Sequence, residues 1–338
     1  MALNAAPGRY MGKSVSVRTM LDRLGRADLV AVRNGETPVA TGFEPLDREL
    51  EGGFRAGELA VLGGPPGVGK TAVALQWARH AAAAGRDVAF VCYEHDPDQL
   101  FGRLLAAEIG ALGAVGDADE RAQLRDVIRD AMAGAWGAQG PASRLPRVRA
   151  ALSRIDVYAH HLQLIGGSRL TTLVELEQLC VEFGAANGLI IVDYLQKLPI
   201  PELAGDSNGR MVAAAEGLKD IALRQHVAVV ALSSAGSQAL RERRLGLPSL
   251  RGAAAIAYEA DIAIVMNEKR EIVSRVHVNS DPARLRSFAG WVVMTIEKNR
   301  RGPAPIDTEF AKNLEFFRLE PAGRYVSEKL IDEILYLE

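Results

Sequence analysis

The chain has 338 residues, of which 48% are hydrophobic and 24% are charged, as is typical of a folded soluble protein long enough for one large α/β domain. Its formal net charge of −2 argues against a protein that coats double-stranded DNA, although a ring can confine positive charge to a channel. Two cysteines are too few for a disulfide framework and no apolar run has membrane-spanning length, so we expect a cytoplasmic protein without a membrane partner.

The first 40 residues are expected to be disordered up to residue 13 and to form a short amphipathic helix over 14–33. From Glu58 onward, apolar runs alternate with helical periodicity. We expect strands at ELAVLGG, DVAFVCYE, RIDVYA, GLIIVDYL and VAVVALSS, and helices over 70–84, 97–109, 111–153 with breaks, 171–186 and 210–226. This order predicts an α/β fold with a mostly parallel, doubly wound central sheet flanked by helices.

The C-terminal part differs, because its apolar runs follow one another without long helices between them. We expect these runs, DIAIVM, EIVSRVHV, WVVMTIEK and DTEF, to be antiparallel or edge strands. The tail SEKLIDEILYLE is expected to form a short amphipathic helix after a serine cap. The sequence therefore predicts an N-terminal segment with a short helix (1–40), a folded core with a C-terminal antiparallel extension (41–321) and a helical tail (322–338).

A complete phosphate-binding loop, G-x-x-x-x-G-K-[ST], follows the first predicted strand and opens the first predicted helix. Its glycines allow backbone N–H groups to approach phosphate oxygens, and the helix directs its positive end at the same anion. Lys70 would supply charge to the outer phosphates, and the Thr71 hydroxyl would ligate Mg²⁺. We therefore predict that ATP and Mg²⁺ bind to Gly64, Pro65, Pro66, Gly67, Val68, Gly69, Lys70 and Thr71.

Two carboxylates stand at the ends of other predicted strands. Asp193 ends an apolar strand in the position that holds Mg²⁺ through water in such sites, and the alternative is an aspartate that caps a turn. Glu94 ends the strand VAFVCYE, from which a carboxylate can reach a water in line with the γ-phosphate. Glu94 is our candidate catalytic base, the alternative being a surface acid in a cluster with Asp96 and Asp98.

Several stretches together carry a family resemblance: TGFEPLDRELEGGFRAGELAVLGGPPGVGKT, VCYEHDPDQLFGRLLA, LIIVDYLQKL, VVALSS, LRGAAAIAYEADIAIVM and EKNRRGP. Over residues 41–321 the chain resembles the C-terminal ATPase domain of DnaB-type replicative helicases, members of the RecA-like superfamily that form hexameric rings. We expect no counterpart of the family's N-terminal helical domain, since only some 40 residues precede the core. We expect those residues to retain the family's linker helix, which packs on the adjacent subunit.

The resemblance implies roles for individual residues. Gly64–Thr71 matches the Walker A loop, Asp193 the Walker B aspartate and Glu94 the catalytic glutamate. Lys298 and Arg300 match the family's lysine and arginine finger, which reach the γ-phosphate bound by the neighbouring subunit. A fixed guanidinium there stabilises the charge that grows on the transferred phosphoryl group. The alternative is that Arg300 is a solvated arginine in a turn.

Two departures from the family bear on DNA. The family has a glutamine after the serine of VVALS, where it senses the γ-phosphate; here that position is Ser234, and the nearest glutamine is Gln238. The family's DNA-contacting loop reads L-R-E-S-G-A-I-E, whereas here it is LRGAAAIA. The resemblance still implies DNA contacts at Arg251, Gly252 and Ala254.

The basic run RERR lies just after VVALSS, where the family's loops approach the channel. Arg241, Arg243 and Arg244 are therefore candidates for contact with the DNA backbone, a contact that would not read sequence. The alternative is a solvated helix face.

These features together indicate a ring-shaped ATPase, expected to be a hexamer, that moves along single-stranded DNA during replication with a loader or a primase as partner. One alternative is a RecA- or KaiC-like ATPase that binds DNA or a protein without unwinding, and the serine at position 234 favours it. A second alternative is a scaffold that assembles on ATP and barely hydrolyses it. Glu94 argues against the scaffold, because a scaffold needs no catalytic base.

Overall fold

The computed structural model describes residues 37–135, 145–182, 187–203, 205–237, 239–274 and 286–331. The unit discussed below is Pro38–Glu338. The predicted disorder at 1–13, the predicted helix at 14–33 and Gln238 lie outside the described residues. No helix in the described ranges combines the length and the apolar character needed to cross a lipid bilayer.

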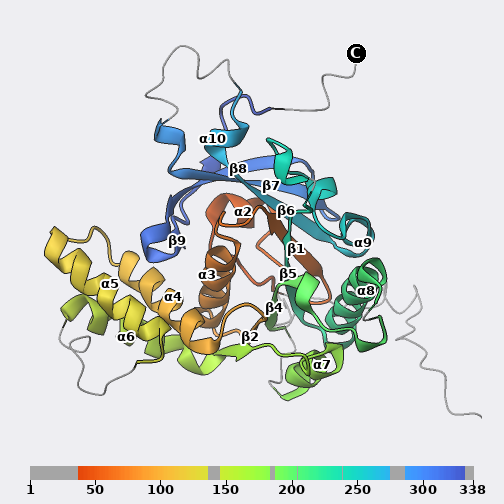
Figure 1. Cartoon of the computed structure of the whole chain (residues 1–338), viewed down its shortest axis with the longest axis horizontal. Coiled ribbons are helices and arrows are strands. Elements are labelled where there is room, and N and C mark those ends of the chain that lie inside the picture. Colours follow the sequence, from red (N-terminus) through yellow and green to blue (C-terminus); the bar gives the residue numbers. More distant parts are fainter. Residues whose placement is uncertain are drawn as a thin grey trace, which may run out of the picture. The chain divides into compact units, whose positions relative to one another are not determined.

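One ten-stranded sheet forms the centre of this unit (Figure 1). Its strand order is β10-β8-β7-β6-β1-β5-β4-β2-β3, and β9 pairs with β8 beside this path. The strands from β3 to β6 in this order are mutually parallel, and β7, β8 and β10 continue the sheet antiparallel. The predicted α/β fold with a mostly parallel sheet and a C-terminal antiparallel extension is therefore confirmed.

The strands are β1 (Leu59–Gly64), β2 (Val88–Cys92), β3 (Leu162–Gly166), β4 (Leu189–Asp193), β5 (Ala228–Ser234), β6 (Ile262–Glu268), β7 (Trp291–Asn299), β8 (Ile306–Asn313), β9 (Arg318–Leu319) and β10 (Arg324–Tyr325). The α-helices are α2 (Glu44–Glu49), α3 (Lys70–Ala83), α4 (Pro97–Gly110), α5 (Ala118–Met132), α6 (Pro146–Tyr158), α7 (Leu173–Glu182), α8 (Ser207–Gln225), α9 (Ala253–Glu259) and α10 (Lys269–Ile272).

Helices cover both faces of the parallel part of the sheet, which explains why its central strands are continuous apolar runs. Every residue of β1, β2 and β4 is buried. On one face, α3, α4, α5 and α6 pack with Phe90 and Ile191 in one core. On the other face, α7 and α8 pack with Ile190 and Val229 in a second core, and Figure 1 draws α3 and α8 on opposite sides of the central strands.

One sequence prediction about strands is wrong, and another is correct only in part. RIDVYA is the end of helix α6, because Ile155 and Tyr158 are buried at helical spacing while Val157 between them is 72% exposed. The strand comes later, as β3. DIAIVM forms β6, which was expected to be an antiparallel or edge strand. It is antiparallel to β7 but lies inside the sheet, and it is parallel to its other neighbour, β1, because the short helix α9 returns the chain to the side of the sheet where β1 begins.

The C-terminal predictions also need correction. The start of EIVSRVHV lies in helix α10, and its residues 275–278 lie outside the described residues. The expected helical tail at 322–338 has no helix in its described part, 322–331. Instead, β10 extends the sheet beside β8, and Leu330 bridges to Val273, because apolar side chains of this segment complete a small core with Phe288. Residues 332–338 lie outside the described part.

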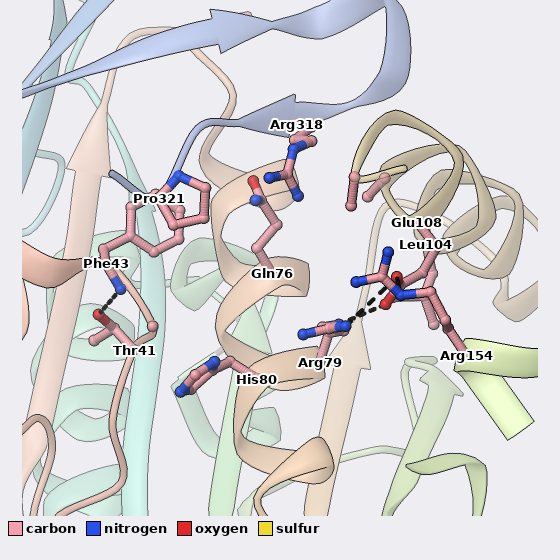
Figure 2. A pocket seen from close by; sticks show the side chains of 13 residues that line it. Thr41, Phe43, Gln76, Arg79, His80, Leu104, Glu108, Arg154, Arg318 and Pro321 are labelled. Atoms are coloured by element: carbon pink, nitrogen blue, oxygen red, sulfur yellow. Dashed lines mark hydrogen bonds and ion pairs between the residues drawn. The ribbon is translucent and has the colours of Figure 1, made fainter. Parts of the chain in front are cut away.

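A small cavity on the α3 side is lined by polar side chains around one buried carboxylate (Figure 2). The carboxylate of Glu108 on α4 is 2% exposed and lies 2.5 Å from Nε of Arg79 and 3.1 Å from Nε of Arg154. The hydroxyl of Tyr158 donates to the same carboxylate at 3.0 Å. Glu108 thereby ties α3, α4 and α6 together at the periphery of the first core.

Replacing Glu108 with alanine is expected to destabilise the fold by about 2–4 kcal/mol, because two arginines then lose the buried charge that pairs with them. Urea unfolding would measure this loss. The matched control is Glu315→Ala, which removes an exposed carboxylate 4.0 Å from Arg121 and should cost less than about 1 kcal/mol. Equal urea concentrations at the midpoint of unfolding for the two variants would contradict a structural role for Glu108.

Candidate active site

The phosphate-binding loop runs from the end of β1 to the first turn of α3, as the sequence predicts. Its glycines adopt positive φ angles, +80° at Gly67 and +102° at Gly69, which L side chains rarely adopt. At Gly64 a Cβ would also lie 2.8 Å from the carbonyl oxygen of Met266 on the adjacent strand. Only glycine therefore permits this backbone path, which directs N–H groups into a concavity suited to an anion.

Lys70 is the first residue of α3 and lies across the mouth of the loop. Its Nζ donates to the carbonyl oxygens of Gly64 and Pro65, each at 2.9 Å. Burial lowers the pKa of the Lys70 ammonium, while the nearby carboxylates of Asp193 and Glu94 act in the opposite direction. The ammonium is thus held at the loop by bonds to neutral carbonyls, which charged phosphate oxygens can replace.

Thr71 and Asp193 meet in the same place. The Thr71 hydroxyl donates to the Asp193 carboxylate at 2.8 Å, and Asp193, the last residue of β4, is 2% exposed. Burial raises the pKa of Asp193, and the charge of Glu94 adds to this, while the bond from Thr71 opposes it. A hydroxyl and a carboxylate beside a phosphate loop are the oxygen donors that Mg²⁺ prefers, so the residues present fit that ion.

Glu94 lies two residues beyond the end of β2, in a loop rather than in the strand. Its side chain is 39% exposed and lies 3.8 Å from Nζ of Lys197. Glu94 lines a cavity of about 550 Å³ together with the loop residues and Asp193. The residues lining this cavity are Pro66, Gly67, Gly69, Lys70, Thr71, Ala72, Glu94, His95, Arg103, Asp193, Tyr194, Ser234, Ala235, Leu314 and Phe317.

Sequence reasoning missed several of these residues, among them Arg103 and Phe317. Arg103 of α4 projects toward the cavity, and its guanidinium lies 5.3 Å from the centre of the Phe317 ring. Burial lowers the pKa of Arg103, against the pull of Asp193. Phe317 comes from the turn after β8, far along the chain. An aromatic ring and a guanidinium offer a flat surface beside the phosphate loop. Arg103 lies in the stretch VCYEHDPDQLFGRLLA, but nothing in that stretch assigned it a role, and Phe317 belongs to none of the stretches that carry the resemblance.

Lys298 and Arg300 lie at the end of the sheet where the parallel strands β1 and β6 begin, whereas the phosphate loop lies at the end where β1 finishes. Arg300 follows β7, whose last residue, Asn299, pairs with Ile262 at the start of β6, and β6 runs parallel to β1. The phosphate loop follows the other end of β1, whose six residues span about 17–20 Å. The predicted finger residues therefore lie far from the phosphate loop of their own chain.

A model of the DnaB-like helicase C-terminal domain family matches residues 38–127 and 142–318. The chain belongs to this family. The predicted family resemblance is confirmed, and the match falls on the phosphate loop, both carboxylates and the Arg300 turn.

Relatives and solved structures agree with this assignment. The chain is 31% identical to the replicative DNA helicase DnaB of Rhodothermus marinus over 77% of this chain and 25% of that protein. It is 30% identical to the replicative DNA helicase DnaC of Bacillus subtilis over 68% of this chain and 47% of that protein. The chain thus matches less than half of the length of either relative.

Two solved structures share the fold of this chain at 18% sequence identity. One is an ATPase domain, and its superposition covers 91% of this chain and 99% of that domain, with a TM-score of 0.68. The other is a DnaB-like replicative helicase studied with its interactions with primase, which covers 90% of this chain and 67% of its own length, with a TM-score of 0.66. At this identity the likeness establishes the fold.

The predicted DNA-contacting residues of this DnaB-like domain lie at the amino end of α9, close to the cavity. Arg251 is exposed, and its backbone N–H donates to the carbonyl of Ser234 at 2.9 Å. Gly252 caps α9 with a φ of +83°, and Ala254 lies in its first turn. Gln196, which sequence reasoning missed, donates to the Ser233 hydroxyl at 2.8 Å and to the carbonyl of Arg251 at 3.1 Å. Position 234 is therefore tied to the predicted DNA loop through backbone and amide contacts.

The three arginines of RERR differ in their surroundings. Arg241 and Arg243 are exposed. The Arg244 side chain is only 15% exposed and forms an ion pair with Asp307 of β8 at 2.8 Å. Its guanidinium is therefore engaged within the chain, which departs from the predicted DNA contact, whereas contacts by Arg241 and Arg243 stay predictions.

Proposed function

We propose that this protein hydrolyses ATP with Mg²⁺ at the interfaces of a ring of identical subunits and uses this reaction to move along single-stranded DNA as a replicative helicase. The observation that carries the proposal is the convergence of Lys70, Thr71, Asp193 and Glu94 on one cavity at the end of a phosphate loop. Membership of the DnaB-like family supports the helicase class of this activity.

Each residue would have a distinct task. The backbone N–H groups of the loop and the Lys70 ammonium bind the phosphates and replace the carbonyl bonds that Lys70 now forms. Thr71 and Asp193 hold Mg²⁺, which supplies charge neutralisation at the phosphates. Glu94 orients the attacking water and accepts its proton. Arg300 of the neighbouring subunit stabilises the charge on the transferred phosphoryl group.

The need for a neighbour follows from the placement of Arg300. Because its guanidinium lies at the edge of the sheet opposite to its own phosphate loop, Arg300 can serve only the loop of another subunit. A closed ring satisfies every such site, and a hexamer is the ring size that the family implies. A loader or a primase is a further partner class, in keeping with the solved relative that was studied with primase. We place this activity in the cytoplasm.

Single-stranded DNA is expected to stimulate ATP turnover several-fold, and the protein is expected to separate the strands of a forked duplex. Phosphate release with and without an oligonucleotide and a fluorescent fork assay measure the two activities. The stimulation should fall steeply with added salt, because Arg241, Arg243 and Arg251 would contact phosphates. Slow turnover that ignores DNA would contradict the proposal.

A second candidate function is a RecA- or KaiC-like ATPase that binds DNA or a protein without unwinding. Ser234, which lines the cavity where the family has glutamine, favours it. Stimulation by DNA without strand separation in the same two assays would identify this function.

A further inference from the structure

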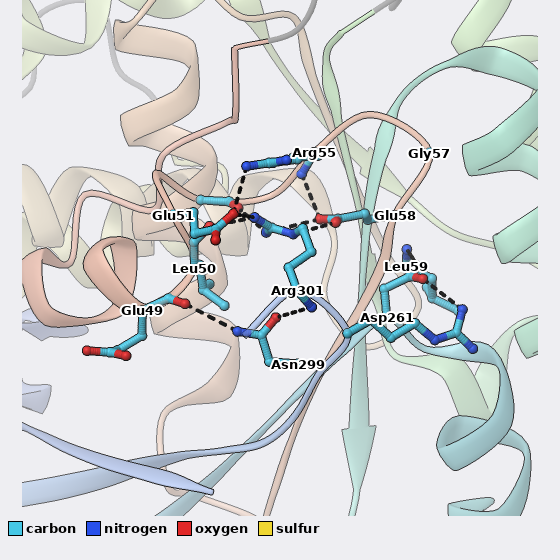
Figure 3. Close-up of polar contacts among 12 residues, drawn as sticks. Glu49, Leu50, Glu51, Arg55, Gly57, Glu58, Leu59, Asp261, Asn299 and Arg301 are labelled. Atoms are coloured by element: carbon cyan, nitrogen blue, oxygen red, sulfur yellow. Dashed lines mark hydrogen bonds and ion pairs between the residues drawn. The ribbon is translucent and has the colours of Figure 1, made fainter. Parts of the chain in front are cut away.

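Asp261 lies between α9 and β6, at the end of the sheet where β6 begins, which is the end opposite to the phosphate loop. Its side chain is 10% exposed. One carboxylate oxygen accepts the backbone N–H of Leu59 at 2.8 Å and Nζ of Lys219 at 2.6 Å, and the other accepts Nη1 of Arg300 at 2.9 Å (Figure 3 places Asp261 beside Leu59). The Asp261 carbonyl also accepts the backbone N–H of Arg300 at 3.0 Å. Asp261 therefore binds Arg300 through both backbone and side chain.

The carbonyl groups at the carboxyl end of α9 bind both predicted finger residues. Nη2 of Arg300 donates to the carbonyl of Tyr258 at 2.6 Å. Nζ of Lys298 donates to the carbonyls of Ala257 at 2.7 Å and Ala260 at 2.5 Å. The free carbonyls at a helix end carry partial negative charge, so this end attracts both cations.

The turn that carries Arg300 is also fixed from the other side. Arg301 donates to the carbonyls of Leu50 and Gly53, each at 2.9 Å, and forms an ion pair with Glu58 at 2.7 Å (Figure 3). The Arg301 side chain is only 16% exposed. The backbone of the turn is therefore anchored, and the direction of the Arg300 side chain depends on Asp261 and Tyr258.

Asp261 contacts Arg300 from one side only. One carboxylate oxygen of Asp261 accepts Nη1 of Arg300, and Lys219 donates to the other oxygen. The Arg300 side chain is 47% exposed, whereas the Asp261 side chain is buried behind it. The guanidinium is thus held from behind and presents its outer side to the surface, where a negatively charged ligand could approach.

We propose that Asp261 is the positioning residue that directs Arg300 toward the nucleotide bound by the neighbouring subunit, an inference that rests on the proposed function. Asp261 does not reach that nucleotide itself. It acts by fixing the angle and the extension of the Arg300 side chain. A small misplacement of a catalytic group lowers the rate by a large factor. Loss of the contact between Asp261 and Arg300 therefore lowers ATP turnover without weakening nucleotide binding by the same chain.

Asp261→Asn is expected to lower kcat for ATP at least about tenfold with little change in KM, because the phosphate loop of the variant chain is intact. The matched control is Lys219→Met, which removes the other cation from the same carboxylate and leaves Arg300 its partner. This control should keep kcat within about twofold of the parent protein, because Lys219 uses the carboxylate oxygen that Arg300 does not use, and the Arg300 side chain keeps its position. Equal kcat values for Asp261→Asn and Lys219→Met would overturn the proposal.

Mixed subunits separate positioning from damage to the variant's own pocket. In rings of Asp261→Asn and Lys70→Ala subunits, an intact pocket meets an intact Arg300, so activity recovers. In rings of Asp261→Asn and Arg300→Ala subunits, no interface has a positioned finger, so activity stays low. The reverse pattern, recovery with Arg300→Ala and none with Lys70→Ala, would place the defect in the pocket of Asp261→Asn and overturn the proposal.

Two further measurements keep the result unambiguous. Mixing Arg300→Ala with Lys70→Ala subunits tests only whether the active site is shared between subunits. If activity does not recover in this mixture, the proposal of a shared site is wrong. The role of Asp261 is then tested by comparing kcat of Asp261→Asn with kcat of Lys219→Met. Should Asp261→Asn melt at a lower temperature because Lys219 is left without its carboxylate, the double variant Asp261→Asn/Lys219→Met removes that charge. A kcat of the double variant equal to that of Lys219→Met would also overturn the proposal.

Discussion

Replacing Lys70 with alanine is expected to lower ATP hydrolysis by roughly 10²–10³-fold, to near background, which is the scale for removal of one preorganised charge donor. The Lys70 ammonium lies at the mouth of the loop, 2.9 Å from the carbonyls of Gly64 and Pro65, where the outer phosphates would replace these bonds. Steady-state phosphate release measures the loss. Circular dichroism melting would establish that the variant remains folded, since the two bonds lost are to carbonyls of the loop itself.

The matched control for this prediction is Lys219→Met. Lys219 is also a half-buried lysine that donates to a backbone carbonyl, that of Gly57 at 2.8 Å, but it lies at the other edge of the sheet. The control should retain turnover and bind nucleotide as the parent protein does. If Lys70→Ala hydrolysed ATP within tenfold of the control, the loop would not be the catalytic phosphate site.

Local sequence signals were sufficient for the phosphate loop and the central strands. The loop is a contiguous octapeptide whose glycines are required by the backbone path itself, at Gly67 and Gly69 among others. The strands β1, β4 and β5 are buried on both faces, so they appear as continuous apolar runs that need no knowledge of their neighbours. Asp193 was found for the same reason, as the polar residue that ends such a run.

The features that sequence reasoning missed depend on contacts between distant segments. Ile155 and Val157 alternate like strand residues, and only packing of α6 against α4 decides which of the two is buried. The parallel direction of β6 depends on the crossover through α9, a helix of seven residues with almost no sequence signature. Arg103 and Phe317 reach the cavity from elements more than two hundred residues apart, so no local pattern could join them.

The contacts of Arg300 are a further case of this kind. EKNRRGP resembles the family's finger, but the sequence alone cannot say which of Arg300 and Arg301 is exposed. The structure separates them, because Arg301 is anchored to Leu50, Gly53 and Glu58 while Arg300 is half exposed on Asp261. Burial of one arginine and exposure of its neighbour support the residue that the resemblance selects.

Glu94→Gln is expected to bind ATP like the parent protein and to hydrolyse it about 10²–10⁴-fold more slowly, the range for loss of a general base. Glutamine keeps the shape of the side chain but cannot accept the proton of the attacking water. Binding should persist, because the loop, Lys70 and Thr71 do not depend on Glu94, which is 39% exposed and pairs with Lys197 at 3.8 Å. Fluorescent-nucleotide titration and phosphate release measure the two properties separately.

The neighbouring acid Asp96 provides the control that decides between Glu94 and the rest of its cluster. Asp96 caps α4 by accepting the backbone N–H of Gln99 at 2.9 Å, and asparagine preserves that cap, so Asp96→Asn should remain folded. It should also hydrolyse ATP normally, because Asp96 serves the helix rather than the cavity. Normal hydrolysis by Glu94→Gln would remove Glu94 as the base, and loss of hydrolysis in Asp96→Asn instead would transfer that role to Asp96.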